Sequence, residues 1–394
     1  MRQQQKLTVA ASFVSLVVAL QPNELTPRRD FFQKVAGTTV GSLVVGSSSL
    51  LGPAEFANAQ AVAAKVNPAV KLPPIGLGCW AWGDPLFWGY DRKNDKELQQ
   101  VFDYAIANSD GPVLFDTAEL YGFGRSEELL GEFSKTRPDK SLIASKFAPF
   151  PFRTKAESVI KACEASVRRL GGRPIDLYQI HFPGAWSNEE YWDGMAKAYD
   201  KGLIKAVGVS NYGVDATRAC YSALAKRGIP LASNQIQYSL LYKYPEENGL
   251  LQACSDLGVQ VLSYSPLALG LLTGKYNREN LPTAVARKTL MESTVTKPEF
   301  SNLIASMKEV ADGHKDATIS QVAINWLRAK WTIPIPGARN LSQVQKNLGA
   351  LGWEMSPEEV RFLDGASSKI SYSSPGAAPF VKQDINTGLI MYDS

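Results

Sequence analysis

From about Lys65 onward, the chain repeats one pattern eight times: a short apolar run, a polar or glycine-containing turn, and a stretch with apolar residues spaced i, i+3, i+4. Short apolar runs between turn residues are typical of buried strands, and the second spacing is typical of amphipathic helices. We therefore predict eight strands, each followed by a helical segment. The predicted strands are Ile75–Cys79, Val113–Asp116, Leu142–Phe147, Leu177–Phe182, Ala206–Ser210, Ser233–Tyr238, Val259–Ser265 and Thr332–Pro336.

Residues that start and stop helices stand beside the predicted helical segments. The helical spacing is clearest in Asn94–Asn108, Lys155–Leu170, Ser187–Lys201 and Asp215–Lys226. Ser187 and Asp215 stand where N-caps belong, and Gly171, Gly202 and Gly228 stand where helices end. The helical interpretation thus has support from both ends of the segments.

This alternation predicts an α/β fold, a closed (β/α)8 TIM barrel with extra loops and a C-terminal tail, whose usual size is about 250 residues. A doubly wound open sheet shares the alternation, and the count of eight favours the barrel. We divide the chain into a targeting leader at residues 1–64, the barrel at 65–369 and a tail at 370–394. The stretch Asn280–Phe300 shows little periodicity and is predicted to be a long loop, over the cofactor or on the surface.

Composition narrows the function classes. Of the 394 residues, 45% are hydrophobic and 20% charged, with a net charge of +4 and no basic block. That balance is normal for a globular protein and gives no reason to expect a nucleic acid as partner. The four cysteines are far apart, without metal-ligand spacing, so we predict neither a metal site nor a disulfide framework.

The leader contains two signal-like elements. Leu7–Leu20 is an apolar run after a basic start, too short to span a bilayer. Arg28 and Arg29 precede two phenylalanines and resemble a twin-arginine export signal, and Ala57–Ala59 offers a small-residue cleavage site. Two tandem elements predict a plastid location, with the thylakoid lumen as the second step and a bacterial periplasm as the alternative. For the mature part we expect a monomer without a transmembrane helix.

Four ionisable residues stand at three successive predicted strand ends. Asp116 ends the second strand and Tyr121 follows in the next loop, while Lys146 ends the third strand and His181 the fourth. Each alone has an ordinary structural explanation, but carboxyl ends of barrel strands converge at one mouth. There Asp116 would keep Lys146 protonated, the cation would depress the pKa of Tyr121, and Tyr121 would donate a proton to a carbonyl oxygen held by His181.

These residues also carry a family resemblance. Asp116-Thr-Ala-x-x-Tyr-Gly, Ser145-Lys146 and Gln179-Ile-His181 resemble the catalytic tetrad of the aldo/keto reductases. The likeness continues strand by strand over about residues 70–368, and its later part is similar to plastid pyridoxal-reductase-like members. It implies reduction of an aldehyde or ketone, such as pyridoxal or another aromatic or apolar aldehyde, with NADPH/NADP+ as cofactor.

The resemblance also implies a set of cofactor-binding residues. Ser210, Asn211 and Gln235 would bind the nicotinamide carboxamide, and Tyr264 would stack on its ring. Arg339 would pair with the 2′-phosphate, although relatives vary at this position. The other residues assigned to the cofactor are Ser265, Leu267 and Gly270 at the pyrophosphate, Gly337 beside Arg339, and Gln343 and Asn347 at the adenine.

Aromatic residues at loop starts suggest where the small carbonyl substrate binds. Trp82, Trp88 and Phe150 are the candidates, with Phe87, Phe182 and Trp186 nearby in the sequence. A flat or apolar aldehyde would suit them.

Three other interpretations fit part of the sequence. One is a nicotinamide-binding regulatory subunit of a membrane or photosynthetic partner. Another is a hydrolase using Asp116 and Glu119, which would leave Lys146 and His181 unexplained. Gly76–Ala81 fits G-x-G-x-x-A, but loop sequence follows it where a dinucleotide fingerprint needs a helix.

Overall fold

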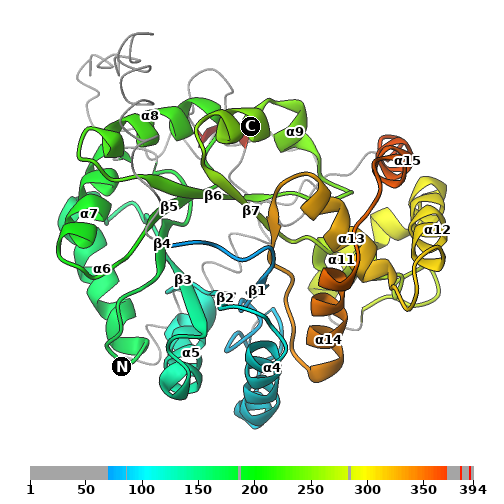
Figure 1. Ribbon diagram of the computed structural model, residues 1–394, viewed down its shortest axis with the longest axis horizontal. Helices are drawn as coiled ribbons and strands as arrows, with labels where there is room; N and C mark the ends of the chain where they lie inside the picture. Colours follow the sequence, from blue (N-terminus) through cyan, green and yellow to red (C-terminus); the bar gives the residue numbers. More distant parts are fainter. Residues whose placement is uncertain are drawn as a thin grey trace, which may run out of the picture.

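The computed structural model describes residues 70–85, 87–184, 188–282 and 285–370, together with 382–383 and 390–391. Its main sheet has eight strands in the order β1 to β8, with every neighbouring pair parallel. The prediction of a (β/α)8 TIM barrel is therefore confirmed (Figure 1). The strands are β1 (Gly76–Gly78), β2 (Val113–Asp116), β3 (Ser141–Phe147), β4 (Leu177–Ile180), β5 (Val207–Ser210), β6 (Leu231–Gln237), β7 (Gln260–Tyr264) and β8 (Ile333–Pro334).

Glycines close the barrel between its first and last strands. Gly78 forms a parallel bridge with Gly337, and its backbone N–H donates to Pro336 O at 3.1 Å. A Cβ atom on Gly78 would lie 2.9 Å from the carbonyl oxygen of Ile335. The glycines of the rejected dinucleotide motif therefore allow close approach of two strands, and no helix begins after them.

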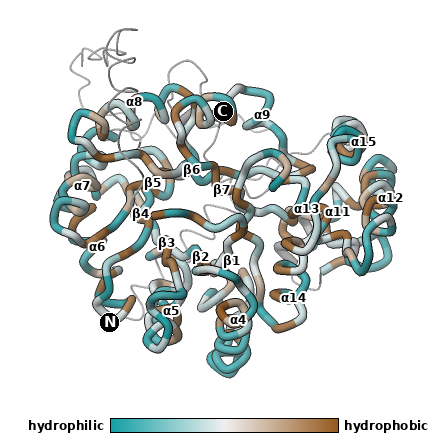
Figure 2. Tube along the Cα trace, viewed as in Figure 1, coloured by the Kyte–Doolittle hydropathy of each residue, from teal (hydrophilic) through white to brown (hydrophobic). Residues whose placement is uncertain are grey.

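Helices surround the strands (Figure 1). Their apolar residues lie toward the strands and their polar residues outward (Figure 2), as expected for amphipathic helices on a core. The helices are α4 (Asp95–Ala107), α5 (Arg125–Phe133), α6 (Ala156–Arg169), α7 (Asn188–Asp200), α8 (Val214–Ala225), α9 (Tyr244–Glu247), α10 (Leu250–Asp256), α11 (Val285–Val295), α12 (Pro298–Asp312), α13 (Ile319–Ala329), α14 (Leu341–Gly349) and α15 (Pro357–Ser367). Within the described ranges, none of them is long and apolar enough to cross a membrane.

The predicted helix ends are largely confirmed. Gly171, Gly202 and Gly228 have φ angles of +79°, +69° and +69°, which favour glycine. The N-cap assignment of Asp215 is wrong, because α8 begins at Val214 after an extended Gly213. Asp215 lies in the first turn instead, where a carboxylate stabilises the positive end of the helix dipole. Ser187 lies outside the described residues.

The long loop predicted at Asn280–Phe300 is partly wrong. The structure has α11 at Val285–Val295 and starts α12 at Pro298. Proline is compatible with the first turn of a helix, where its missing N–H would have no intrahelical partner. Apart from a two-stranded ladder of Lys382–Gln383 with Ile390–Met391, the predicted tail lies outside the described residues, and so does the leader.

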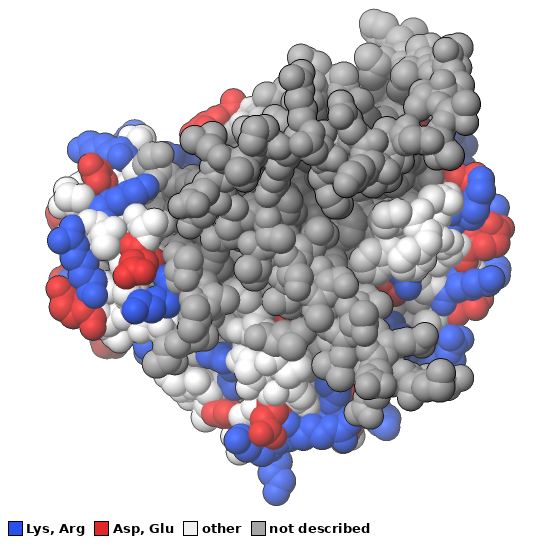
Figure 3. All heavy atoms as spheres, turned by 180° about the vertical axis from the view of Figure 1, so that it is seen from behind, with Lys and Arg blue, Asp and Glu red and all other residues white. Residues whose placement is uncertain are grey.

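Two layers of side chains fill the barrel interior. The lower layer is apolar and belongs to a buried cluster that includes Leu114, Ala144, Leu177, Ala206, Leu262 and Ile333. Two residues further along three of these strands, on the same strand face, stand Asp116, Lys146 and Gln179, all buried. The polar layer therefore rests on an apolar floor at the carboxyl ends of the strands. On the face seen in Figure 3, basic and acidic side chains are interspersed over the described residues.

Candidate active site

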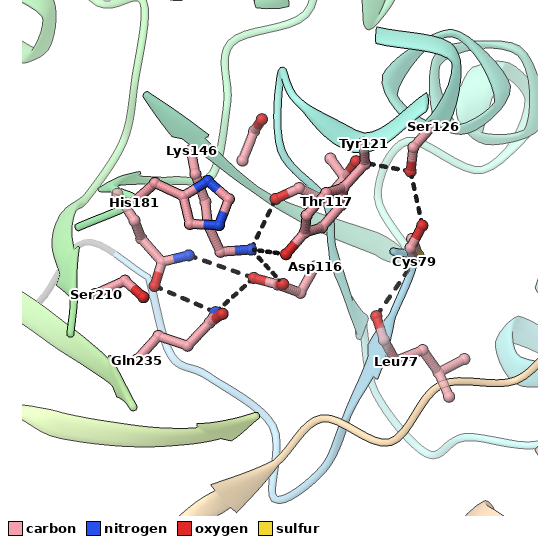
Figure 4. A network of polar contacts seen from close by, with 12 residues as sticks. Leu77, Cys79, Asp116, Thr117, Tyr121, Ser126, Lys146, His181, Ser210 and Gln235 are labelled. Atoms are coloured by element: carbon pink, nitrogen blue, oxygen red, sulfur yellow. Dashed lines mark hydrogen bonds and ion pairs between the residues drawn. The ribbon is translucent and has the colours of Figure 1, made fainter. Parts of the chain in front are cut away.

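A buried ion pair lies at the centre of the barrel mouth (Figure 4). Lys146 Nζ lies 2.5 Å from Asp116 Oδ1 and donates to Thr117 O at 2.9 Å. The Lys146 side chain is fully buried and that of Asp116 is 3% exposed. Burial lowers the pKa of Lys146 from its ordinary value, and Asp116 opposes that effect. The predicted pairing of Asp116 with Lys146 is present.

Tyr121 contacts the same cation. Its Oη lies 3.4 Å from Lys146 Nζ, which also lies 4.9 Å from the centre of the tyrosine ring. The loop after Tyr121 is tight because Gly122 has a φ of +57°. A Cβ atom on Gly122 would lie 2.1 Å from Gly83 O, so the loop packs directly on the loop after β1. This packing fixes Tyr121 at the mouth.

One electrostatic prediction is wrong. Burial, together with the Asp116 carboxylate, raises the pKa of Tyr121 well above its ordinary value, although Lys146 was expected to depress it. The cation is already paired with Asp116, so its attraction for a phenolate does not outweigh the cost of desolvating it. Tyr121 therefore keeps its proton at neutral pH.

His181 completes the tetrad. Its ring lies edge-on to that of Tyr121, with 5.8 Å between centroids. Its Nδ1 atom is buried and has no hydrogen-bond partner among the described residues. Burial and the Lys146 cation hold the pKa of His181 well below its ordinary range. A neutral imidazole at this position has one N–H to donate to a substrate oxygen.

Glu119 has a structural role. Its Oε1 accepts from Ala148 N at 2.7 Å and from Arg153 Nη1 at 2.6 Å. With Asp116 paired to Lys146 as well, the two carboxylates of the hydrolase alternative are both engaged in ion pairs. This pairing disfavours that alternative further.

Residues at the ends of β5 to β7 form a hydrogen-bond network beside His181. Asn211 has a φ of +60°, and its Nδ2 donates to His181 O at 3.0 Å and to Ser210 Oγ at 3.1 Å. Tyr264 Oη donates to Asn211 Oδ1 at 2.9 Å. At the end of β6, Gln235 Nε2 donates to Asp116 Oδ2 at 2.7 Å. The network connects predicted cofactor residues to the tetrad.

The segment after β7 has several residues with positive φ angles. Ser265, Ala268 and Leu269 have φ angles of +51°, +46° and +57°, and Gly270 has +108°. Non-glycine residues in this region are strained, and such strain concentrates at functional sites. The turns are closed by hydrogen bonds within the segment, since Ala268 N donates to Ser265 O and Gly270 N donates to Leu267 O, both at 2.8 Å.

The segment after β8 presents Arg339. Its guanidinium lies 5.5 Å from the Trp88 ring centre, and Nη1 donates to Trp88 O at 3.1 Å. Gln343 Oε1 accepts from Arg339 N at 2.7 Å, and Asn347 Nδ2 donates to Gly337 O at 3.2 Å. Asn347 is buried, so its hydrogen bond to Gly337 O stabilises the segment after β8.

The predicted substrate residues separate into two groups. Trp82 is a correction, because it is fully buried, packs on Phe115 and donates from Nε1 to Ala338 O. Trp88 and Phe150 are partly exposed, and Phe150 stacks on Phe152. Trp186 lies outside the described residues.

Trp80 was missed by the sequence reasoning. Its ring centroid lies 6.3 Å from that of Tyr121, and its ring stacks on Phe87 at 5.1 Å and meets Trp88 edge-on at 5.5 Å. Strand alternation gave no signal for it, because residues two apart on a strand share a face and Trp80 lies in the turn after β1. We name Trp80, Phe87 and Trp88 the aromatic wall.

The cysteines are buried thiols. All four cysteines are free and buried, and burial raises the pKa of Cys163 to about 12. Over the described ranges, no group of three His, Cys, Asp or Glu residues could hold a metal ion.

Comparison with known proteins agrees with this geometry. Residues 74–368 match the aldo/keto reductase family. The chain is 40% identical over 323 residues to "Pyridoxal reductase, chloroplastic" of Arabidopsis thaliana, covering 77% of this chain and 86% of that protein.

Solved structures are similar as well. The glycerol dehydrogenase AKR11B4 from Gluconobacter oxydans is 26% identical with a TM-score of 0.67, covering 77% of this chain and 94% of that one. An aldo-keto reductase from Klebsiella pneumoniae in complex with NADPH is 25% identical with a TM-score of 0.59, covering 75% and 90%. The chain therefore belongs to the aldo/keto reductase family and is an NADP-dependent oxidoreductase.

Proposed function

We propose that this protein reduces an aldehyde to an alcohol with NADPH, and that Tyr121 donates the proton. The position of Lys146 is the main support, since its ammonium contacts both Asp116 Oδ1 and Tyr121 Oη. A carbonyl group becomes an alcohol when its carbon gains a hydride and its oxygen gains a proton. The reduced nicotinamide supplies the hydride when it is bound. The chain has to supply the proton and hold the oxygen.

Tyr121 suits the role of general acid. It is protonated at neutral pH because burial raises its pKa. An alkoxide is a much stronger base than a phenolate, so the proton moves readily to the developing oxyanion. Lys146 then stabilises the phenolate left behind, and neutral His181 orients the carbonyl oxygen by donating one N–H.

The residues at the strand ends fit the cofactor. Ser210 and Asn211 offer hydroxyl and amide groups for a carboxamide, and Tyr264 offers a ring for stacking. The backbone from Ser265 to Gly270 would hold the pyrophosphate. Arg339 is exposed and would pair with the 2′-phosphate.

We infer an aromatic aldehyde as substrate and propose pyridoxal. Trp80 of the aromatic wall lies beside the proton donor, with stacked Phe87 behind it. Aromatic rings favour offset or edge contacts with other rings, worth about 0.5–1.5 kcal/mol each. The Arabidopsis relative is named a pyridoxal reductase.

A substrate panel tests this proposal. NADPH oxidation by the purified protein would be followed with pyridoxal, benzaldehyde and a straight-chain aldehyde, and pyridoxine would be identified by chromatography. We expect kcat/KM for the two aromatic aldehydes to exceed that of the straight-chain aldehyde by about threefold to tenfold, the size of one or two ring contacts. Equal values would contradict an aromatic substrate, and absence of turnover with every aldehyde would contradict the reductase.

We also propose a plastid location, supported by the leader and by the chloroplastic relative. The twin-arginine-like segment favours the thylakoid lumen within the plastid. A fusion of residues 1–65 to a fluorescent protein that stays in the cytosol would contradict import. The bacterial periplasm, the monomeric state and the regulatory-subunit alternative stay predictions.

A further inference from the structure

Gln179 lies in the polar layer directly beside the catalytic ion pair. It stands on β4 opposite Lys146 of β3 and is fully buried. Its Nε2 donates to Asp116 Oδ2 at 3.3 Å, and its Oε1 accepts from Gln235 Nε2 and Ser233 Oγ, both at 3.5 Å. The tetrad mechanism gives Gln179 no role, although these contacts join β4 to residues of β2 and β6.

The neighbouring strand provides the space for this side chain. Gly208 of β5 stands opposite Gln179 in the sheet register. A Cβ atom on Gly208 would lie 2.9 Å from Gln179 Cγ and 2.4 Å from Ser233 Oγ. Any larger residue at position 208 would therefore displace Gln179 from its path to Asp116.

The carboxylate determines how both glutamines are oriented. An ionised carboxylate only accepts hydrogen bonds, so Gln179 and Gln235 must both present their NH2 groups to Asp116 Oδ2. Asp116 then accepts from Lys146 on one oxygen and from two amides on the other. Gln179 also accepts from Gln235, which gives the second amide one orientation.

We propose that Gln179 is a positioning residue that keeps Asp116 ionised and aligned, and thereby holds Lys146 against Tyr121. The inference rests on the proposed function and deepens it. A buried carboxylate needs hydrogen bonds to remain charged, because desolvation favours its neutral form. Without the amide of Gln179, the buried Asp116 carboxylate loses one of its hydrogen bonds, and its pairing with Lys146 is weakened.

Four other titratable groups lie around Asp116. They are Cys79 after β1, Lys146 on β3, His181 after β4 and Tyr121 in the following loop. Burial raises the pKa of Cys79 and Tyr121 and lowers that of His181, so all three stay uncharged around neutral pH. Asp116 and Lys146 are therefore the two charged groups in this cluster, and the loss of the hydrogen bond from Gln179 acts on this pair.

The test measures kcat against pH for Gln179→Met and Gln179→Glu. Methionine has a similar volume but neither amide group, so the acid limb of the profile should move up by about one pH unit, the size of one charge-assisted hydrogen bond. Glutamate places a second carboxylate beside Asp116, and the limb should move further because the two share a proton. An acid limb at the wild-type pH in both variants would overturn the proposal.

The matched control is Gln321→Met. Gln321 is also buried, on α13, and its side chain bonds Thr318 N and Trp353 Nε1, away from the tetrad. This variant should lower Tm and leave the acid limb in place. If Gln179 had only a structural role, Gln179→Met would give the same two results.

A second readout needs no turnover. The loss of unfolding free energy in Gln179→Met should shrink as the pH falls, because an amide N–H bonds more strongly to a charged carboxylate than to a neutral one. The loss in Gln321→Met should stay constant with pH. Equal pH dependence in the two variants would overturn the proposal. Failure of the proposed function would appear separately, as absence of turnover in the wild-type protein.

Discussion

Arg339 and Trp88 are 251 residues apart in sequence, yet the guanidinium of one lies 5.5 Å from the ring centre of the other and donates to its carbonyl oxygen. Trp88 belongs to the aromatic wall, which reaches Tyr121 through Trp80. Arg339 belongs to the segment after β8. The contact therefore joins the residue proposed to bind the 2′-phosphate to the aromatic wall proposed to bind the substrate.

Arg339→Met should weaken NADPH binding by about tenfold to a hundredfold, because hydrogen bonds to charged groups contribute about 1.5–3 kcal/mol. NADH lacks the 2′-phosphate, so its Kd should change little. Quenching of tryptophan fluorescence by each cofactor gives both constants. Arg339→Lys keeps the charge without the planar guanidinium group. Its Kd for NADPH should lie between those of the wild-type protein and Arg339→Met. Equal losses for NADPH and NADH would contradict the assignment of Arg339.

Tyr121→Phe should lower kcat by about 10² to 10⁴, the usual contribution of a general acid. NADPH binding and Tm should change little, because the ring and its packing remain. Stopped-flow turnover and fluorescence titration measure the two effects. Near-normal kcat in this variant would show that another group supplies the proton.

Replacing one member of the buried ion pair should destabilise the protein more than replacing both. Lys146→Met leaves Asp116 buried without its cation and should cost about 3–5 kcal/mol of unfolding free energy. The double variant Asp116→Leu/Lys146→Met removes both charges and should unfold at a higher urea concentration than Lys146→Met. Additive losses in this double-mutant cycle would mean that the two side chains act independently.

The pH dependence follows from the raised pKa of Tyr121. A general acid works while it is protonated, so kcat for reduction should not decline through loss of the Tyr121 proton between pH 7 and about 10, the ordinary phenol value. Alcohol oxidation needs the phenolate and should speed up over the same range. A fall in reduction centred near pH 8 would indicate a depressed pKa instead.

Trp80 and Trp82 offer a matched pair of substitutions two residues apart. Trp80→Ala should raise KM for aromatic aldehydes by about threefold to tenfold with little loss of stability, because Trp80 lies at the wall. Trp82→Ala should lower the unfolding free energy by about 3–5 kcal/mol, because Trp82 is fully buried. Aldehyde kinetics measure the first effect and urea unfolding the second. A large loss of stability in Trp80→Ala together with a raised KM in Trp82→Ala would contradict both assignments.

The sequence predicted the strands more accurately than the outer segments. Strand patterns such as Val113–Asp116 rest on continuous apolar runs, which burial on both faces requires. The region from Val285 to Val295 formed a helix that its weak periodicity did not indicate. Met291 and Val295 of this helix pack in a core cluster with Leu271 and Leu272, residues far away in the sequence.

By itself, the sequence indicated the barrel and the four residues proposed as the tetrad, because apolar runs and the polar residues that end them are local properties of the chain. Tertiary structure alone decided what surrounds them. It placed Trp82 in the core and Trp80 at the wall, turned Gln235 toward Asp116, and raised the pKa of Tyr121 by burial. Desolvation and long-range packing depend on what the rest of the chain places around a side chain, and no local pattern encodes that environment.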